Sequence, residues 1–370
     1  MADRLLVGTK KGLFTIERAA EGRWSVASVG FLGEPVSMTL RDPRDGYTYC
    51  ALNLGHFGTK LHRSADGGAT WEEVAVPVYP GEVPVTENET TNGNGAVDSL
   101  KQIWSLEAAG PEHAGALWAG TIPGGLFRSD DRGSSWNLIT TLWDLPERKQ
   151  WFGGGADAPG IHSICVDPRN SDHVTLGVSC GGVWETGDGA QTWAVRATGM
   201  FAEYMPPEMR FNPNIQDPHR VVQCPSAPEA LWAQHHNGVF RSTDGAASWQ
   251  EVPDVQPSVF GFAVAVHPSD PDTAWFVPAV KDVSRVPVDG KVVVVARTRN
   301  GGKSFDTLRR GLPQEHAYDL VYRHSLDIDG SGDRLAFGST TGSLWVTEDQ
   351  GDSWQAISEH LPPIFCVRFA

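Results

Sequence analysis

The stretch Arg241-Ser242-Thr243-Asp244-Gly245-Ala246-Ala247-Ser248-Trp249 recurs in near-copies along the whole sequence of 370 residues. The other copies are RSADGGATW (63–71), RSDDRGSSW (128–136), ETGDGAQTW (185–193), RTRNGGKSF (297–305) and VTEDQGDSW (346–354), with a fainter ERAAEGRW at 17–24. From Trp71 onward, the closing aromatic residues stand about 50 to 65 residues apart, which is the period of an array of similar structural units. The sequence therefore predicts one repeat domain rather than several unrelated ones.

Each copy has the composition of a tight hairpin turn. Asp244 can accept hydrogen bonds from turn amides, and the glycine that follows tolerates a positive φ. The apolar residues before the turn and Trp249 after it then belong to two antiparallel strands. A tryptophan at this position buries a large area, so we expect it to pack between neighbouring units.

The pattern S-x-D-x-G-x-[ST]-W resembles the Asp-box, or BNR, repeat of sialidases, sortilin-type receptors, xyloglucanases and a photosystem assembly factor. On this pattern the chain is identified as a member of the BNR-repeat β-propellers, a group that includes glycosyl hydrolases. In that family the boxes are structural and lie on the face away from the active site. The resemblance therefore implies a fold and leaves the chemistry open.

Each unit divides into four short β-rich runs, A to D from the centre outward, separated by Gly, Pro and Asp. In the third unit these runs are 102–108, 116–121, 125–129 and 136–142. The first unit begins at its second run, 5–8, and a spare apolar run, 364–369, ends the chain. Pairing the spare run with 5–8 closes the ring and removes exposed sheet edges. We therefore predict an all-β fold, a single seven-bladed β-propeller closed by its C-terminal strand, with six or eight blades as alternatives.

The predicted propeller is one domain, 1–370. Its predicted blades are residues 1–30 with 364–370, 35–80, 101–145, 160–198, 206–254, 258–310 and 316–359.

Composition and charge limit the partners and the cellular location that we expect for this protein. A formal charge of −15 and a pI near 5.2 argue against nucleic acid or an anionic membrane as a partner, since both favour a basic surface. The N-terminus lacks the apolar core of a signal peptide, and no run is long enough to span a membrane, which predicts a cytoplasmic protein. The five cysteines are odd in number and scattered, which favours buried thiols over disulfides.

Loop length predicts where a ligand binds. In a propeller the D-to-A and B-to-C connections emerge on one face, and the A-to-B and C-to-D turns on the other. Nearly all of the long connections belong to the first class: 77–100, 142–160, 197–209 and 309–317 are D-to-A connections, and 280–291 is the one long B-to-C loop. A short motif at 42–46, 167–172, 212–220 and 267–272 is assigned to the A-to-B turns, and Asp217 and His219 are set aside as part of it. We expect a small-molecule or glycan site on the loop-rich face, over the central channel.

The candidate residues on that face fall into two groups. The candidates for acid, base or nucleophile are Asp157, Glu203, Tyr204 and Glu208. The candidates for ligand binding are Trp151, His162, His235, His236, Lys281, Asp282, Arg285, Tyr318 and Arg323. A carboxylate beside a phenol can activate a nucleophile, as in glycosidases with a tyrosine nucleophile. The cations of the 280–291 loop form either an anion clamp or a solvated salt-bridge cluster.

Several of these candidates have a structural alternative. Adjacent side chains on a strand point to opposite faces, so only one of His235 and His236 can face the channel. The glycine-rich run 151–157 is interpreted as a tight aromatic loop rather than a phosphate loop. No cofactor is predicted. If a divalent metal is bound, its ligands come from His56, His162, His235, His236 and His316, with Glu203 or Glu208.

Three classes of function remain open. The first is a hydrolase of glycosidase type acting on a small polar or glycan-like ligand. A true sialidase is not expected, because the Arg-Ile-Pro motif of sialidases has no counterpart in this chain; Thr121-Ile122-Pro123 lacks the arginine. Xyloglucanase-like enzymes use a cleft between two propellers, whereas this chain supplies one. The second class is a non-catalytic propeller that binds a protein partner, and the third is a metal-dependent enzyme using histidines of the channel mouth.

Overall fold

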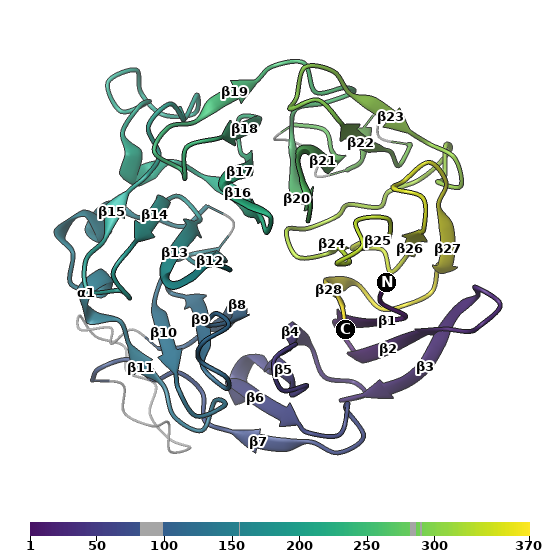
Figure 1. Cartoon of the computed structure of the whole chain (residues 1–370), viewed down its shortest axis with the longest axis horizontal. Helices are drawn as coiled ribbons and strands as arrows, with labels where there is room; N and C mark the ends of the chain where they lie inside the picture. Colours follow the sequence, from purple (N-terminus) through teal and green to yellow (C-terminus); the bar gives the residue numbers. More distant parts are fainter. Residues whose placement is uncertain (82–98, 155, 282–285, 289–290) are drawn as a thin grey trace.

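Seven four-stranded antiparallel sheets stand around a central channel in the computed structural model (Figure 1). The structure describes residues 1–81, 99–154, 156–281, 286–288 and 291–370. The predicted all-β, seven-bladed propeller is therefore confirmed. None of the helices in the described ranges has the length and apolar character needed to cross a membrane.

In each of the first four blades the strands follow one another from the centre of the ring outward. Blade 1 comprises β28 (Ile364–Phe369), β1 (Arg4–Thr9), β2 (Gly12–Arg18) and β3 (Trp24–Gly30). Blade 2 comprises β4 (Val36–Arg41), β5 (Thr48–Asn53), β6 (Thr59–Ser64) and β7 (Glu72–Val74). Blade 3 comprises β8 (Gln102–Ala108), β9 (Leu117–Ile122), β10 (Leu126–Ser129) and β11 (Asn137–Leu138). Blade 4 comprises β12 (Ile161–Asp167), β13 (Asn170–Val178), β14 (Gly182–Thr186) and β15 (Ala194–Val195).

The last three blades have the same order. Blade 5 comprises β16 (Pro218–Cys224), β17 (Ala227–His235), β18 (Val239–Ser242) and β19 (Gln250–Val252). Blade 6 comprises β20 (Gly261–His267), β21 (Asp270–Pro278), β22 (Val295–Thr298) and β23 (Asp306–Leu308). Blade 7 comprises β24 (Leu326–Ile328), β25 (Leu335–Gly338), β26 (Leu344–Thr347) and β27 (Gln355–Ser358). The short helices are η1 (Gly55–Phe57), α1 (Thr140–Trp143), η2 (Pro146–Gln150) and η3 (Pro213–Ile215).

Both ends of the chain build blade 1. Strand β28 pairs with β1, with Leu6 opposite Arg368 and Val7 opposite Val367. The two termini meet beside this pair of strands in Figure 1. The ring is therefore closed by hydrogen bonds between the first and last strands, as the spare apolar run predicts.

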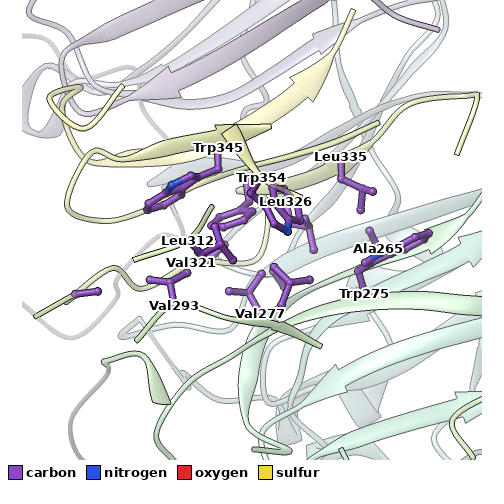
Figure 2. Close-up of a cluster of buried hydrophobic side chains, with 14 residues drawn as sticks. Ala265, Trp275, Val277, Val293, Leu312, Val321, Leu326, Leu335, Trp345 and Trp354 are labelled. Carbon is purple, nitrogen blue, oxygen red and sulfur yellow. The ribbon is translucent and has the colours of Figure 1, made fainter. Parts of the chain in front are cut away.

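Large aromatic side chains fill the spaces between blades. Figure 2 shows such a cluster between blades 6 and 7, to which Trp275 of β21, Trp345 of β26 and Leu326 of β24 all belong. All three side chains are buried. Because each blade is covered on both faces by its neighbours, second strands such as β1, β5, β9 and β25 are buried at almost every position rather than at alternate ones.

The recurring turns share one hydrogen-bond pattern. In blade 5, the hydroxyl of Ser242 donates to Oδ1 of Asp244 over 2.8 Å, and the hydroxyl of Ser248 donates to Oδ2 over 2.6 Å. The same pattern recurs at Asp66, Asp131 and Asp349. The acidic side chain thus accepts the hydrogen bonds that stabilise the turn predicted from the repeat.

Two local predictions are wrong. The outer strand expected at 136–142 is β11, only Asn137–Leu138, because the chain then turns into α1 and buries Leu142 against blade 4. The segment 212–220 is not an A-to-B turn. It precedes an inner strand instead: Asn212 caps η3 by accepting from the amide of Asn214, and β16 begins at Pro218.

Candidate functional site

A cavity of about 460 Å³ opens at one end of the central channel. It lies where the D-to-A connections enter the inner strands, on the loop-rich face, and its size is usual for a small-molecule site. Its lining comprises Lys10, Pro35, Val36, Ser37, Asn53, Gln102, Trp104, Gly154, Asp217, His219, His236, Phe260, Phe262, Tyr322, Arg323, His324 and Phe365.

Breaks in strand register place several of these side chains in the cavity. The inner strand of blade 3 shifts register between Ile103 and Ser105, which leaves Trp104 without a partner residue in the ladder. Corresponding shifts omit Ser37, His219 and Phe365 from their ladders. A β-bulge redirects the side chain of the extra residue. A bulge repeated near the start of the inner strands therefore turns one residue per strand toward the channel.

The walls of the cavity are largely aromatic. Phe262 packs edge to face with both Phe260 and Tyr322, with ring centroids 5.4 Å and 5.3 Å apart. The Arg323 guanidinium lies 4.7 Å from the centroid of Trp104 and 5.6 Å from that of Phe262. These contacts hold a cation over apolar rings at the edge of the cavity.

Asp217 supplies a buried carboxylate. Its Oδ1 accepts hydrogen bonds from the amide of Cys180 over 3.0 Å and from the hydroxyl of Ser179 over 3.3 Å. Burial raises the pKa of Asp217, but the neighbouring imidazole of His219 and the charge of Arg323 hold it far below its ordinary value. The carboxylate is therefore ionised at neutral pH.

Cys180, whose amide donates to Asp217, has an unusual backbone conformation. Cys180 has φ +46°, in the left-handed region that residues other than glycine rarely adopt. Backbone strain of this kind persists where the surrounding structure requires it, often at functional sites. In this loop it turns an amide toward the carboxylate.

Two imidazoles face the other oxygen of Asp217. Its Oδ2 lies 3.4 Å from Nε2 of His219 and 3.7 Å from Nδ1 of His236. The three ligand atoms all lie within 4.8 Å of one another. The Nδ1 atom of His219 is 2.7 Å from the carbonyl oxygen of Gly261, and its ring stacks on Phe262 at 4.6 Å. One carboxylate and two histidines are thus aimed at one point on the cavity wall.

Two of the predicted ligand-binding residues, His236 and Arg323, line the cavity. His235 is fully buried behind it, where its Nε2 accepts a hydrogen bond from the amide of Asp217 over 3.0 Å. His162 is also fully buried, with its ring 5.5 Å from that of Trp104. These two histidines support lining residues and do not themselves line the cavity.

The other predicted ligand-binding residues that the structure describes lie away from the cavity. Trp151 packs on Trp184 between blades 3 and 4, with centroids 5.6 Å apart. Lys281 pairs with Glu203 over 2.8 Å, and Tyr318 is 57% exposed. Asp282 and Arg285 lie outside the described residues.

The predicted catalytic residues lie around the rim. Asp157 lines a smaller depression, about 240 Å³, which shares Asn53 and Gln102 with the cavity. The ring of Tyr204 packs on His236 at 4.9 Å, and its hydroxyl donates to the carbonyl of Ile215 over 3.4 Å. Burial raises the pKa of Tyr204. Glu208 is exposed, and Glu203 is held in its ion pair with Lys281.

The predicted metal ligands do not gather as a set. Within the described residues, only His236 of the five named histidines belongs to a group with metal-ligand spacing, and its companions are Asp217 and His219. His56 lies beside Phe57 on an exposed loop, and His316 is exposed.

The assignment of Asp217 and His219 to an A-to-B turn, which sets them aside, is therefore wrong. His219 lies in the inner strand β16 and Asp217 directly precedes that strand, and both side chains line the cavity. The signal that could have found His219 is an alignment of the starts of the inner strands. In several inner strands the residue that is left out of the strand pairing stands between two residues that do pair. The three stretches are Ile103-Trp104-Ser105, Ile161-His162-Ser163 and Ile364-Phe365-Cys366.

The sequence has relatives among xyloglucanases. It is 23% identical to the oligoxyloglucan-reducing end-specific xyloglucanase of Emericella nidulans, over 91% of this chain and 42% of that protein. It is also 23% identical to a probable enzyme of that kind from Neosartorya fischeri, over 74% of this chain and 32% of that protein. The chain thus spans less than half the length of these curated relatives. No family model matches the sequence.

Solved structures share the fold at low identity. The GH74 enzyme of Niastella koreensis aligns with a TM-score of 0.56 at 16% identity, over 94% of this chain and 54% of that one. A protein from Lactobacillus plantarum aligns over the full length of both chains with a TM-score of 0.63 at 11% identity. The structure of YCF48 bound to D1 peptide aligns with a TM-score of 0.50 at 14% identity, over 87% of this chain and 82% of that one. The chain is a seven-bladed propeller whose curated homologues are glycoside hydrolases.

Proposed function

We propose that this chain binds a glycan-like ligand in the channel-mouth cavity and hydrolyses a glycosidic bond there. The observation that carries the proposal is a buried, ionised carboxylate, Asp217, facing a cavity with aromatic walls. Aromatic faces such as Trp104 and Phe262 suit the apolar faces of sugar rings, and a few polar side chains among them suit sugar hydroxyls. The homology to xyloglucanases supports the same class of reaction.

The proposed roles follow from position. Asp217, with His219 beside it, polarises the attacking water or stabilises positive charge that develops on the sugar. Asp157 is the proposed general acid, because its depression adjoins the cavity through Asn53 and Gln102. The rim residues Glu203, Tyr204 and Glu208 are assigned to contacts with further parts of the ligand.

We assign the recurring hairpin turns to the BNR/Asp-box class, because one aspartate accepts from two hydroxyls in turn after turn. These turns lie between the third and fourth strands of each blade, away from the cavity, so they are given no catalytic role. The proposed activity is that of a glycosidase other than a sialidase.

The size of the cavity bears on the size of the ligand. A single cavity of about 460 Å³ holds a small ligand. We therefore propose a short oligosaccharide rather than an intact polysaccharide as the substrate.

The test is a hydrolysis assay of the purified protein with xyloglucan oligosaccharides and a panel of nitrophenyl glycosides. Asp217→Asn should lower kcat/KM at least ~100-fold, which is the usual contribution of a positioned acid or base. Asp254→Asn, which changes an exposed carboxylate in the loop between blades 5 and 6, is the matched control and should leave the rate unchanged. Flat rates with every substrate, or equal rates for Asp217→Asn and wild type, would refute the proposal.

A second candidate function is binding of a protein partner without catalysis. Large apolar side chains are exposed on connections of the loop-rich face: Leu32, Phe57, Val78, Phe152, Tyr204, Phe211 and Tyr318. Apolar side chains exposed together on one face are a feature of interaction surfaces. The fold shared with YCF48, solved with a bound peptide, is consistent with this use. Capture from a native extract should then recover a stoichiometric partner that Phe211→Ser and Phe57→Ser release.

A further inference from the structure

We propose that Asp217, His219 and His236 form a binding site for one divalent transition-metal ion, with zinc as the best fit. The three residues come from the start of β16 and from the connection between β17 and β18, and their ligand atoms lie within 4.8 Å of one another. The proposal concerns the carboxylate that the proposed function also uses, but metal binding does not depend on hydrolysis.

The hydrogen bonding of His219 gives the first argument. Its Nδ1 is 2.7 Å from the carbonyl oxygen of Gly261, which can only accept, so Nδ1 carries the proton. In a neutral imidazole Nε2 then presents a lone pair, and this atom is 3.4 Å from Oδ2 of Asp217. Two acceptors face each other, which is unfavourable unless a cation lies between them. That cation is either a proton on Nε2 or a metal ion.

The spacing of the ligand atoms distinguishes these two occupants. Zinc binds imidazole nitrogen and carboxylate oxygen at roughly 2.0–2.1 Å, so two ligands of a tetrahedral ion stand about 3.4 Å apart. The distances from Oδ2 of Asp217 to the two imidazole nitrogens are 3.4 Å and 3.7 Å. A charged N–H···O hydrogen bond would hold the atoms at about 2.7–2.9 Å. The observed separations match ligands around an ion better than a direct hydrogen bond.

The surroundings orient each ligand. Oδ1 of Asp217 is occupied by the amide of Cys180 and the hydroxyl of Ser179, which leaves Oδ2 for an ion. His219 is fixed by the Gly261 carbonyl and by stacking on Phe262. Metal-binding histidines commonly donate their other ring nitrogen to a carbonyl in this way, which fixes the tautomer.

The third ligand is held by aromatic rings. The imidazole of His236 packs between Tyr204 at 4.9 Å and Phe260 at 5.7 Å. Two nitrogens and one carboxylate oxygen form the ligand set of zinc enzymes and of iron sites, and oxygen-preferring Mg²⁺ and Ca²⁺ fit it poorly. With three protein ligands on one wall, the remaining coordination position faces the cavity, where a water or a ligand oxygen can bind.

The test is calorimetric titration of the metal-depleted full-length chain with ZnCl₂, together with the absorption spectrum of the Co²⁺ form. The wild-type protein should bind about one Zn²⁺ per chain, and its Co²⁺ form should show the visible absorption bands of tetrahedral Co²⁺. Titration with MgCl₂ or CaCl₂ should give no binding signal. His236→Gln should weaken zinc binding at least ~10-fold, since removing even an outer partner of a metal ligand has an effect of that size. His360→Gln, which changes an exposed histidine on the same face, should bind zinc as wild type does.

Two results would overturn the proposal: zinc binding well below one equivalent by wild type, or equal affinities for wild type and His236→Gln. His236 is partly exposed, so its variant should fold, and thermal melting of both metal-free proteins checks this. Asp217→Asn provides a second variant for the same titration. If zinc binds but no glycoside is cleaved, the proposed function fails and the metal site stands. If a glycoside is cleaved equally before and after metal depletion and zinc does not bind, the metal site fails alone.

Discussion

Val7 of β1 lies opposite Val367 of β28, and both side chains are fully buried at the join between the two ends of the chain. Beside them, Leu5 and Ile364 belong to the same cluster, which also includes Leu344 of blade 7. The last strand therefore contributes to the core of two blades. Closing the ring and packing the first and seventh blades depend on the same few side chains.

Deleting residues 364–370 should consequently abolish the closed ring. Without β28, the inner edge of β1 is unpaired and the apolar faces of blades 1 and 7 are exposed to water. We expect loss of cooperative unfolding and a strong tendency to aggregate, measured by circular dichroism melting and size-exclusion chromatography. A truncated chain that is monomeric and melts like wild type would contradict this structural role.

A point variant tests the same join more finely. Ile364 is fully buried between β25 and the first blade, and Ile364→Ala should lower the free energy of unfolding by about 2–5 kcal/mol. Val29→Ala in the outer strand of blade 1, where the side chain is 40% exposed, should cost less than about 0.5 kcal/mol. Urea denaturation of the three proteins gives the comparison.

Trp249 should anchor blade 5 against blade 4. Its side chain is 3% exposed, its Nε1 donates to the carbonyl of Arg196 over 2.8 Å, and it packs with Val183 and Met200. Trp249→Ala should lower the free energy of unfolding by about 3–5 kcal/mol, as for other buried aromatic residues. The half-buried Trp193 occupies the same turn position in blade 4, so Trp193→Ala should cost less. A loss below about 1 kcal/mol for Trp249→Ala would show that the indole is not an anchor.

The fold could be predicted from the sequence because it depends on local motifs that repeat along the chain. The turn ending in Trp249 recurs with a regular period, and the spare apolar run that contains Val367 pairs with the first strand as predicted. Alternation along a strand also required His235 and His236 to point in opposite directions, and in the structure only His236 lines the cavity. Each of these inferences needed only local sequence and the geometry of a strand.

The carboxylate and its histidine partner could not be predicted in the same way. His219 reaches the cavity because β16 shifts register between Pro218 and Arg220, and such a bulge interrupts the alternation on which strand predictions rest. Asp217 lies just before that strand in a segment whose Asn and Pro content resembles the true turns elsewhere. Its partners, Ser179 and Cys180, belong to another blade. Contacts between blades depend on the assembled ring and leave no spacing pattern in the sequence.

Stability should fall with decreasing pH because of buried neutral histidines. Burial, assisted by the charge of Arg220, lowers the pKa of His324 well below its ordinary value of 6.5, and burial does the same for His162. Below about pH 6.5 the unfolded chain binds protons that the folded chain does not, so the free energy of unfolding decreases as the pH falls. Above about pH 6.5 this contribution to stability is fully present.

His324→Gln should make that dependence shallower. A glutamine keeps an N–H group for the carbonyl of His162, which Nε2 of His324 contacts at 2.7 Å, but cannot take up a proton. Each titrating group changes the slope by at most about 1.4 kcal/mol per pH unit. Urea midpoints across the acidic and neutral range give the slopes, with His113→Gln at an exposed site as the control. Parallel profiles for wild type and His324→Gln would mean that this histidine is not held neutral.

Gly154 should be required for access to the Asp217 carboxylate. A Cβ added at this position would lie 2.7 Å from Sγ of Cys180, 2.9 Å from Oγ of Ser179 and 3.3 Å from Oδ2 of Asp217. The first two distances are too short for real atoms, so the chain must move and disturb the groups that hold the carboxylate. Gly154 thus allows its loop to approach the cavity wall closely.

Gly154→Ala should therefore lower both zinc affinity and any glycosidase activity at least ~10-fold, while the propeller stays folded, since the shift of one loop leaves the core between blades intact. Gly187→Ala is the matched control, because a Cβ there meets nothing within 4 Å. Calorimetric titration with zinc and the glycoside assay measure the two losses, and thermal melting checks the fold. If Gly154→Ala binds zinc and turns over substrate as Gly187→Ala does, then Oδ2 of Asp217 is not the atom on which either proposal depends.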